Sequence, residues 1–257
     1  MLPSIKLFRI FWIALGAALF LVTLKYLFHA LGWEVIEQSS LHNGVISSVT
    51  FVIGFLLSAT IADYKESERI PSEFSSTIED MYDDATAIHQ NYPVFDLDGF
   101  RRQLRKVALG FGKEVRKGSH NASQDIRDLA PFFAAMEQGK VPPNFVVKLK
   151  QQSTTLLRNR QRVNYIQRIK FIPSATILAR SIVLMTLALL LFTNIDPFYG
   201  GLSIVGIICF ILTYILILIN VISTPFHAAG RTQDDVSLYL VKNTAEYLSR
   251  NNEKYDV

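Results

Sequence analysis

The sequence has little cysteine and little charge. Of its 257 residues only Cys209 is a cysteine, and charged residues make up 19% of the chain. A lone cysteine excludes a fold held together by disulfides. An excess of 26 basic over 22 acidic residues is too small to indicate a nucleic-acid-binding protein. The sequence also lacks a Walker loop, a GxSxG motif and an HExxH motif, which are common signatures of enzymatic sites.

Apolar residues are abundant and clustered. They make up 50% of the sequence, which excludes intrinsic disorder, and the mean hydropathy of +0.25 is high for a soluble protein. A helix that crosses about 30 Å of hydrocarbon needs about 20 such residues. We therefore predict four transmembrane helices, over about 10–33, 44–62, 175–193 and 203–222. The first stretch could instead be a signal peptide, because Lys6 and Arg9 precede it, but it is long and no small-x-small cleavage site follows.

The distribution of lysine and arginine predicts the orientation of the spans. Residues 63–174 hold 18 of the 26 basic residues. The connection between the first two spans contains Glu34 and Glu37, and the connection between the last two contains Asp196 and no basic residue. Since cytoplasmic loops are enriched in Lys and Arg, we predict that residues 63–174, residues 223–257 and both termini are cytoplasmic.

The polar middle of the chain has the periodicity of helices. Four helices are predicted there, over 72–91 (beginning after Pro71), 97–117, 123–138 and 144–172. No strand pattern competes with them. The sequence therefore predicts an all-α membrane protein with four transmembrane helices, over 1–62 and 175–222, and a cytoplasmic helical region, 63–174, between spans two and three.

The second span has two different faces. At about 100° per residue, small, hydroxylated and aromatic residues fall within one arc: Ser47, Thr50, Phe51, Gly54, Phe55 and Ser58. The opposite side is aliphatic, with Val49, Val52, Ile53, Leu56 and Leu57. One interpretation is helix–helix packing, because small residues let backbones approach closely in lipid.

The other interpretation of this face is a pore lining. If several copies surround an axis, Phe51 and Phe55 form a hydrophobic collar one turn deep, which can gate by dewetting. The edges of phenylalanine rings carry partial positive charge, so rings presented edge-on favour an anion over a cation. Ser47 and Ser58 would supply hydroxyl donors on either side of the collar.

Motifs in and after this span resemble those of a known family. Thr50-Phe-Val-Ile-Gly-Phe55 is followed by a polar stretch ending in Glu68-Arg-Ile-Pro71, and Pro225-Phe226 follows the fourth span. These segments are similar to the second transmembrane helix and the later Pro-Phe pair of bestrophin-type channels, including bestrophin-like proteins of bacteria. The motifs cover 44–71 and one dipeptide, whereas the similar order of spans covers the whole chain.

The resemblance implies a homopentamer that passes chloride and other small anions along a central axis. It implies that Phe51 and Phe55 are neck residues; the family has a third apolar neck residue where this sequence has Ser47. Calcium-activated members carry acids directly after the Pro-Phe pair, but here Asp234 and Asp235 come later. Calcium needs about six to eight oxygen ligands, and none of the 5 histidines has metal-ligand spacing. We predict no metal and no cofactor.

Three further basic residues are candidates for attracting anions. Arg168 and Lys170 end a basic run before the third span, and Arg180 lies about one turn inside it. They could focus anions at the inner mouth of a pore. Alternatively, Arg180 snorkels to the headgroups, and the run marks topology and contacts membrane lipid. Acids such as Glu66 could also pair with this run.

Two functions fit these patterns. The first is an oligomeric ion channel, selective for anions such as chloride, with passive permeation through a pore lined by the second span. The alternative is a non-conducting membrane anchor or scaffold whose cytoplasmic helices bind a partner protein. An enzyme is a weaker hypothesis, because no clustered acid/base or metal-binding constellation is present in the sequence.

Overall fold

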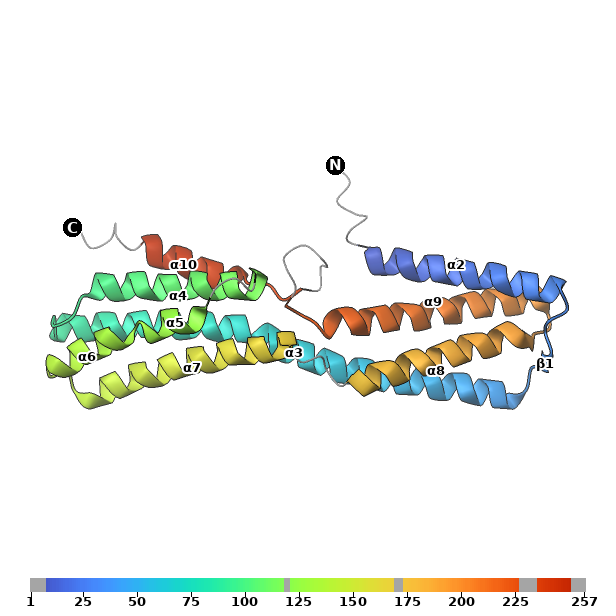
Figure 1. Cartoon of the computed structure of the whole chain (residues 1–257), viewed down its shortest axis with the longest axis horizontal. Coiled ribbons are helices and arrows are strands. Elements are labelled where there is room, and N and C mark those ends of the chain that lie inside the picture. The colour runs from blue at the N-terminus through green and yellow to red at the C-terminus, as the bar shows by residue number, and fades with distance from the viewer. Residues whose placement is uncertain (1–7, 118–120, 169–172, 227–234, 251–257) are drawn as a thin grey trace. The chain divides into compact units, whose positions relative to one another are not determined.

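The computed structural model describes residues 8–117, 121–168, 173–226 and 235–250, and this part of the chain is almost entirely helical (Figure 1). In chain order its elements are α2 (Arg9–Ala30), β1 (Ile36–Glu37), α3 (Ser40–Asn91), α4 (Leu97–Lys117), α5 (Ala122–Arg127), α6 (Ala130–Gln138), α7 (Pro143–Arg168), α8 (Pro173–Phe192), β2 (Thr193–Asn194), α9 (Phe198–Ile222) and α10 (Tyr239–Arg250). Four of these helices are long and apolar enough to cross a membrane: α2, α3, α8 and α9. They correspond to the four predicted spans, although α2 ends at Ala30, three residues before the predicted end, and residue 193 of the third predicted span lies in β2.

The chain packs as two compact units. The first unit takes its described residues from Met1–Tyr64 and Lys170–Thr224. The second unit takes them from Lys65–Ile169, Pro225–Arg231 and Asp235–Val257. Helix α3 contributes its first part to the first unit and the remainder to the second.

In the first unit, α2 packs along α9, and α8 contacts both (Figure 1). The approach of α2 to α9 is close at Gly206, where an added Cβ would lie 2.9 Å from Cγ2 of Val22. Helix α3 joins this unit through its aliphatic side. Its buried residues Val49 and Ile53 form one cluster with residues of α8 and α9: Val183, Leu212 and Ile219.

One short sheet was not predicted. Strands β1 and β2 pair in parallel, with Ile36 opposite Thr193 and Glu37 opposite Asn194. Each strand has only 2 residues, which is too short for the alternation of apolar and polar residues that marks a strand in sequence. The sheet joins the α2–α3 connection to the α8–α9 connection.

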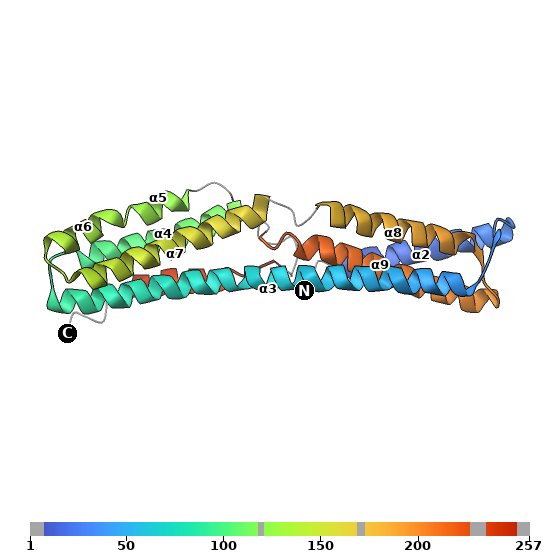
Figure 2. The ribbon, with the colours of Figure 1, turned by 90° about the horizontal axis from the view of Figure 1, so that it is seen from below.

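The prediction that a helix begins after Pro71 was wrong, because α3 runs from Ser40 to Asn91 with Pro71 inside it (Figure 2). A proline inside a helix lacks the N–H that would bond to the carbonyl four residues earlier. On either side of it, Ile70 and Phe74 are buried in the second unit. Their packing outweighs the local preference for a helix end.

The single helix predicted over 123–138 was also wrong. The structure has α5 and α6 instead, and Pro131 lies in the first turn of α6. A proline fits the start of a helix and cannot donate to a preceding turn, so the chain turns at Asp128 and Leu129. By contrast, the helix predicted over 97–117 is confirmed to the residue as α4, and the helix predicted over 144–172 corresponds to α7, with 169–172 outside the described residues.

Helix α10 lies in the C-terminal segment, where no helix was predicted, and packs on α4. Its buried apolar side chains Val241, Ala245 and Leu248, together with Leu238 just before the helix, recur at three- and four-residue steps. The Thr244 hydroxyl donates to Oε1 of Glu79 at 2.6 Å, which ties α10 to α3.

A nearly buried carboxylate joins α4, α5 and α7. Glu114 accepts from the Arg160 guanidinium at 2.6 and 3.0 Å. It also accepts from the side-chain amide of Asn164 at 3.0 Å and the backbone N–H of Ala122 at 2.7 Å. Burial raises the pKa of Glu114, but these hydrogen bonds outweigh burial, so its pKa lies below the ordinary 4.5.

We expect Glu114→Gln to lower the free energy of unfolding by about 1.5–3 kcal/mol at neutral pH, the range for hydrogen bonds to charged groups. A carboxylate with a lowered folded-state pKa stabilises the fold above its unfolded-state value, and this contribution is lost as the pH falls below 4.5 through the folded-state pKa. The difference in melting temperature between wild type and Glu114→Gln should therefore be smaller at pH 4 than at pH 7. Glu137→Gln, which breaks only the exposed pair with Lys150, is the control; equal melting temperatures for the two variants would contradict the role of Glu114.

Candidate functional site

The two faces of the second span have different surroundings in the structure. Phe51 and Phe55 are 76% and 73% exposed, and the other residues of the predicted lining are exposed as well: Ser47, Thr50, Gly54 and Ser58. On the other side Val49 and Ile53 lie in the core of the first unit. Within one chain, the aliphatic face is therefore the packing face, with Val52 an exception at 40% exposed.

Gly54 does not serve close packing within the described chain. A Cβ added there would have no atom within 4 Å other than those of its neighbours and of its own helix backbone. The hydroxyl of Thr50 donates to the carbonyl of Ile46 in the same helix, at 2.8 Å, so it needs no partner from another helix. These observations remove packing inside the subunit as the reason for the small and aromatic face, and the lining of a pore by that face stays a prediction.

The predicted anion-attracting residues lie in different units. Arg180 is exposed on α8, and its guanidinium donates to the side-chain oxygen of Asn220 on α9 at 3.2 Å. Arg168 is the exposed last residue of α7 in the second unit. Lys170 lies outside the described residues. The pairing of the basic run with acids is found at Arg162, which binds Glu66 at 2.5 Å.

Sequence reasoning missed a buried charge cluster in the first unit. Lys25 of α2 is 1% exposed, and its ammonium lies 2.5 Å from a carboxylate oxygen of Glu34. The same ammonium donates to the backbone carbonyls of Leu191 and Thr193. It therefore holds the α2–α3 connection and the β2 strand to α2. A lysine near the end of an apolar stretch was the available signal, since ionisable residues there rarely lack a partner.

His29 completes this cluster. Its Nδ1 donates to the second oxygen of Glu34 at 2.7 Å, and its ring stacks on Phe198 with centroids 3.7 Å apart. Burial raises the pKa of the Glu34 carboxyl, but the hydrogen bond from His29 and the attraction to Lys25 outweigh burial, so its pKa is lowered. The carboxylate is thus held in its charged form. In the described part of the chain, no group of 3 or more His, Cys, Asp or Glu side chains is placed to hold a metal ion.

Comparisons with known proteins bear on the fold. No protein-family model matches the sequence, and no curated protein matches it. Among solved structures, a bacterial bestrophin homolog from Klebsiella pneumoniae is similar, with a TM-score of 0.74 and 12% identity over 93% of this chain and 96% of that chain. One single-residue variant of that homolog gives a TM-score of 0.77 with 11% identity, over 96% of this chain and 98% of that chain. Another gives a TM-score of 0.72 with 13% identity, over 98% of this chain and 100% of that chain.

The fold and these similarities give the class of the protein. It is an all-α membrane protein with four membrane-spanning helices and a helical region between the second and third, as predicted. Within that class, the chain has the bestrophin-like fold over nearly its whole length. The resemblance inferred from Thr50–Phe55 and Pro225-Phe226 is thereby confirmed at the level of fold.

Proposed function

We propose that the protein is an oligomeric ion channel, selective for small anions such as chloride, whose pore is lined by α3. The observation that carries this proposal is the exposure of Phe51 and Phe55. They project from a helix whose opposite face lies in the core of its own subunit, in a chain with the fold of a bacterial bestrophin homolog. A stripe of small and hydroxylated residues on a spanning helix is typical of contact with other helices in lipid, and further copies of the same helix around an axis supply such a contact.

In the proposed mechanism, anions move passively down their gradient through a ring of identical subunits, five if the chain assembles as the family resemblance implies. The phenyl rings form a dry collar that gates by dewetting, and their positive edges favour anions. Hydroxyls of Ser47 and Ser58 replace part of the hydration shell on either side. Arg168, Lys170 and Arg180 raise the anion concentration near the cytoplasmic mouth.

The same proposal places the chain as a multi-pass protein of the cell (inner) membrane with both termini and the second unit in the cytoplasm. The support is the location of 18 of the 26 basic residues within 63–174, against none between the third and fourth spans. Anionic lipid of the cytoplasmic leaflet would contact this basic region.

The channel proposal is tested by recording purified protein in planar bilayers under a chloride gradient. We expect a reversal potential close to the chloride equilibrium potential, and detergent-solubilised particles that image as closed rings of identical subunits with α3 innermost. Bilayers fused with protein-free vesicles are the control. Silent bilayers, currents that reverse at the cation potential, or monomeric particles would contradict the proposal.

A second function is favoured by the size of the second unit. It packs around its own core, including Phe74 stacked on Phe111 with centroids 4.0 Å apart, which is more structure than anchoring requires. A non-conducting scaffold would use this unit to bind a partner protein. A stable stoichiometric complex formed through residues 63–174, together with silent bilayers, would favour it over the channel.

A further inference from the structure

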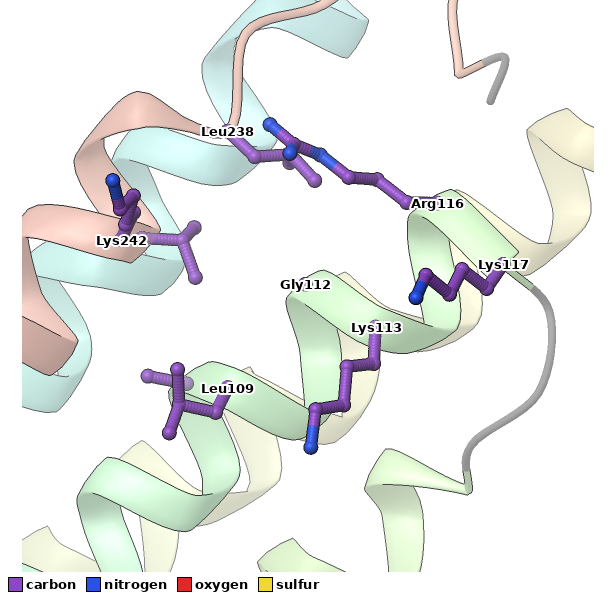
Figure 3. Close-up of a pocket in the computed structure, with 9 residues that line it drawn as sticks. Leu109, Gly112, Lys113, Arg116, Lys117, Leu238 and Lys242 are labelled. Carbon is purple, nitrogen blue, oxygen red and sulfur yellow. The ribbon is translucent and has the colours of Figure 1, made fainter. Parts of the chain in front are cut away.

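The second unit has an open cavity between α4 and α10 (Figure 3). Its volume is about 250 Å³. The buried side chains of Ala108, Leu238 and Val241 form its apolar floor. The cavity is thus a hydrophobic recess on the surface of a polar, helical unit.

A glycine keeps this recess open. A Cβ added at Gly112 would meet no atom within 4 Å, so no neighbouring helix requires a glycine there for close approach. Glycine in a helix interior weakens the helix relative to alanine or leucine. Gly112 therefore weakens α4 slightly and leaves space beside the apolar floor.

Four cations surround the recess: Lys113, Arg116, Lys117 and Lys242. In the described residues, no carboxylate pairs with any of the three on α4. In Figure 3 the guanidinium of Arg116 extends from α4 toward Leu238, whereas the ammonium groups of Lys113 and Lys242 point away from the space between α4 and α10. Because lysine side chains have long flexible stems, these ammonium groups can turn toward an anion at the opening.

Helix ends alone do not account for this cluster. Arg116 and Lys117 lie in the last turn of α4, where cations favour the helix dipole. Lys113 lies a turn earlier, and Lys242 lies in the first turn of α10, where the dipole disfavours a cation. Lys242 does reach Glu246 at 3.5 Å, but both side chains are exposed, and a lysine that precedes its glutamate is the weaker order.

We propose that this recess binds a small amphiphilic anion, with one apolar chain against Ala108, Leu238 and Val241 and a carboxylate or phosphate head held by Lys113 and Arg116. A purely polar anion would gain nothing from the apolar floor, and a neutral lipid would gain nothing from the cations. At about 250 Å³ the recess is smaller than the sites of drug-sized ligands, about 300–1,000 Å³, so it holds one chain rather than a whole two-chain lipid.

The test uses the full chain in nanodiscs of zwitterionic phosphatidylcholine, titrated with decanoate or decyl phosphate by calorimetry, with empty nanodiscs as the blank. We expect saturable binding of one molecule per chain that weakens with added salt. Acetate, which has the head without the chain, and decanol, which has the chain without the head, should bind at least about tenfold more weakly. The binding assay needs no conductance, so it stands or falls separately from the channel proposal.

Three variants separate the site from non-specific partitioning. Gly112→Leu projects a side chain into the recess and favours the helix, and its Cβ meets no atom within 4 Å, so we expect a folded protein with decanoate affinity lowered about tenfold or more. Lys113→Gln combined with Arg116→Gln should lower it about fivefold and flatten the salt dependence. The control is Arg105→Gln, which removes one exposed cation of α4 about 12 Å before Lys113 and should change affinity less than about twofold.

Two further outcomes are informative. A membrane lipid and a free amphiphile can carry the same anionic head and apolar chain. If phosphatidylglycerol in the nanodisc competes with decanoate, the natural occupant is a lipid. If it does not compete, the occupant is a free amphiphile. The proposal is overturned if Gly112→Leu binds decanoate like wild type, or if the charge variant does so. It is also overturned if these variants change the number of subunits instead, because the recess would then be a contact between copies of the chain.

Discussion

Replacing Lys25 with methionine is expected to lower the free energy of unfolding by about 3–5 kcal/mol, the usual cost of removing one partner from a buried ion pair. The ammonium is almost fully buried, and Glu34 is 5% exposed. Without the lysine, His29 is the one partner that the carboxylate keeps among the described residues, and the carbonyls of Leu191 and Thr193 lose a donor. Methionine has a similar length, so the loss is of charge and hydrogen bonds and not of volume.

The loss should appear as a fall in melting temperature of about 6–20 °C for a chain of this size. It can be followed as the folded fraction that survives heating in detergent, measured by fluorescence-detected size exclusion. Lys65→Met is the matched control, because Lys65 is an exposed lysine of α3, and it should melt like wild type. Equal melting temperatures for Lys25→Met and Lys65→Met would show that the buried cluster does not hold the two connections together.

A double replacement distinguishes an unpaired charge from a lost tether. When Glu34→Gln is added to Lys25→Met, no buried charge is left without a partner, so we expect part of the stability to return. The remaining deficit measures the donors that the two carbonyls have lost. If the double variant is less stable than Lys25→Met, the buried carboxylate itself is not the source of the loss.

The regular parts of this fold could be predicted from sequence because they depend on local pattern. Helix α4 was predicted to the residue, since Phe100, Leu104 and Phe111 repeat at helical steps and are all buried. Pro71 shows the limit of local rules, because packing of Ile70 and Phe74 overrides its preference for a helix end. The pairing of Ile36 with Thr193 joins residues far apart in the chain, and two-residue strands leave no periodic signal.

The candidate site was predictable in part for the same reason. Helical periodicity alone separated Val49 and Ile53, which the structure buries, from Phe51 and Phe55, which it leaves exposed. The cluster of Lys25 and Glu34 was not predicted, because the two residues are brought together by a turn whose geometry the pattern of apolar residues does not contain. The surroundings of the exposed phenyl rings depend on other molecules. A pore at this face is therefore a hypothesis when argued from the sequence, and it is still a proposal when argued from the structure of one chain.

The combined change Phe51→Ala and Phe55→Ala is expected to raise the single-channel conductance and to weaken anion selectivity. The collar limits the flow because a narrow apolar ring excludes water and an ion must shed hydration to pass. Alanine widens the ring and lets water fill it, and a fall of about 1.4 kcal/mol in the barrier corresponds to about a tenfold rise in the rate of passage. Selectivity falls as well, because the positive ring edges that favour anions are gone.

Phe20→Ala is the matched control, because Phe20 is a phenylalanine of α2 that is 69% exposed and lies outside the predicted lining. It should leave conductance and reversal potential unchanged, while both change in the double alanine variant. Because Phe51 and Phe55 are 76% and 73% exposed in their own subunit, the double variant should also melt like wild type, so a change in current cannot be attributed to unfolding. Unchanged currents in a stable double variant would place the permeation path elsewhere than along this face of α3.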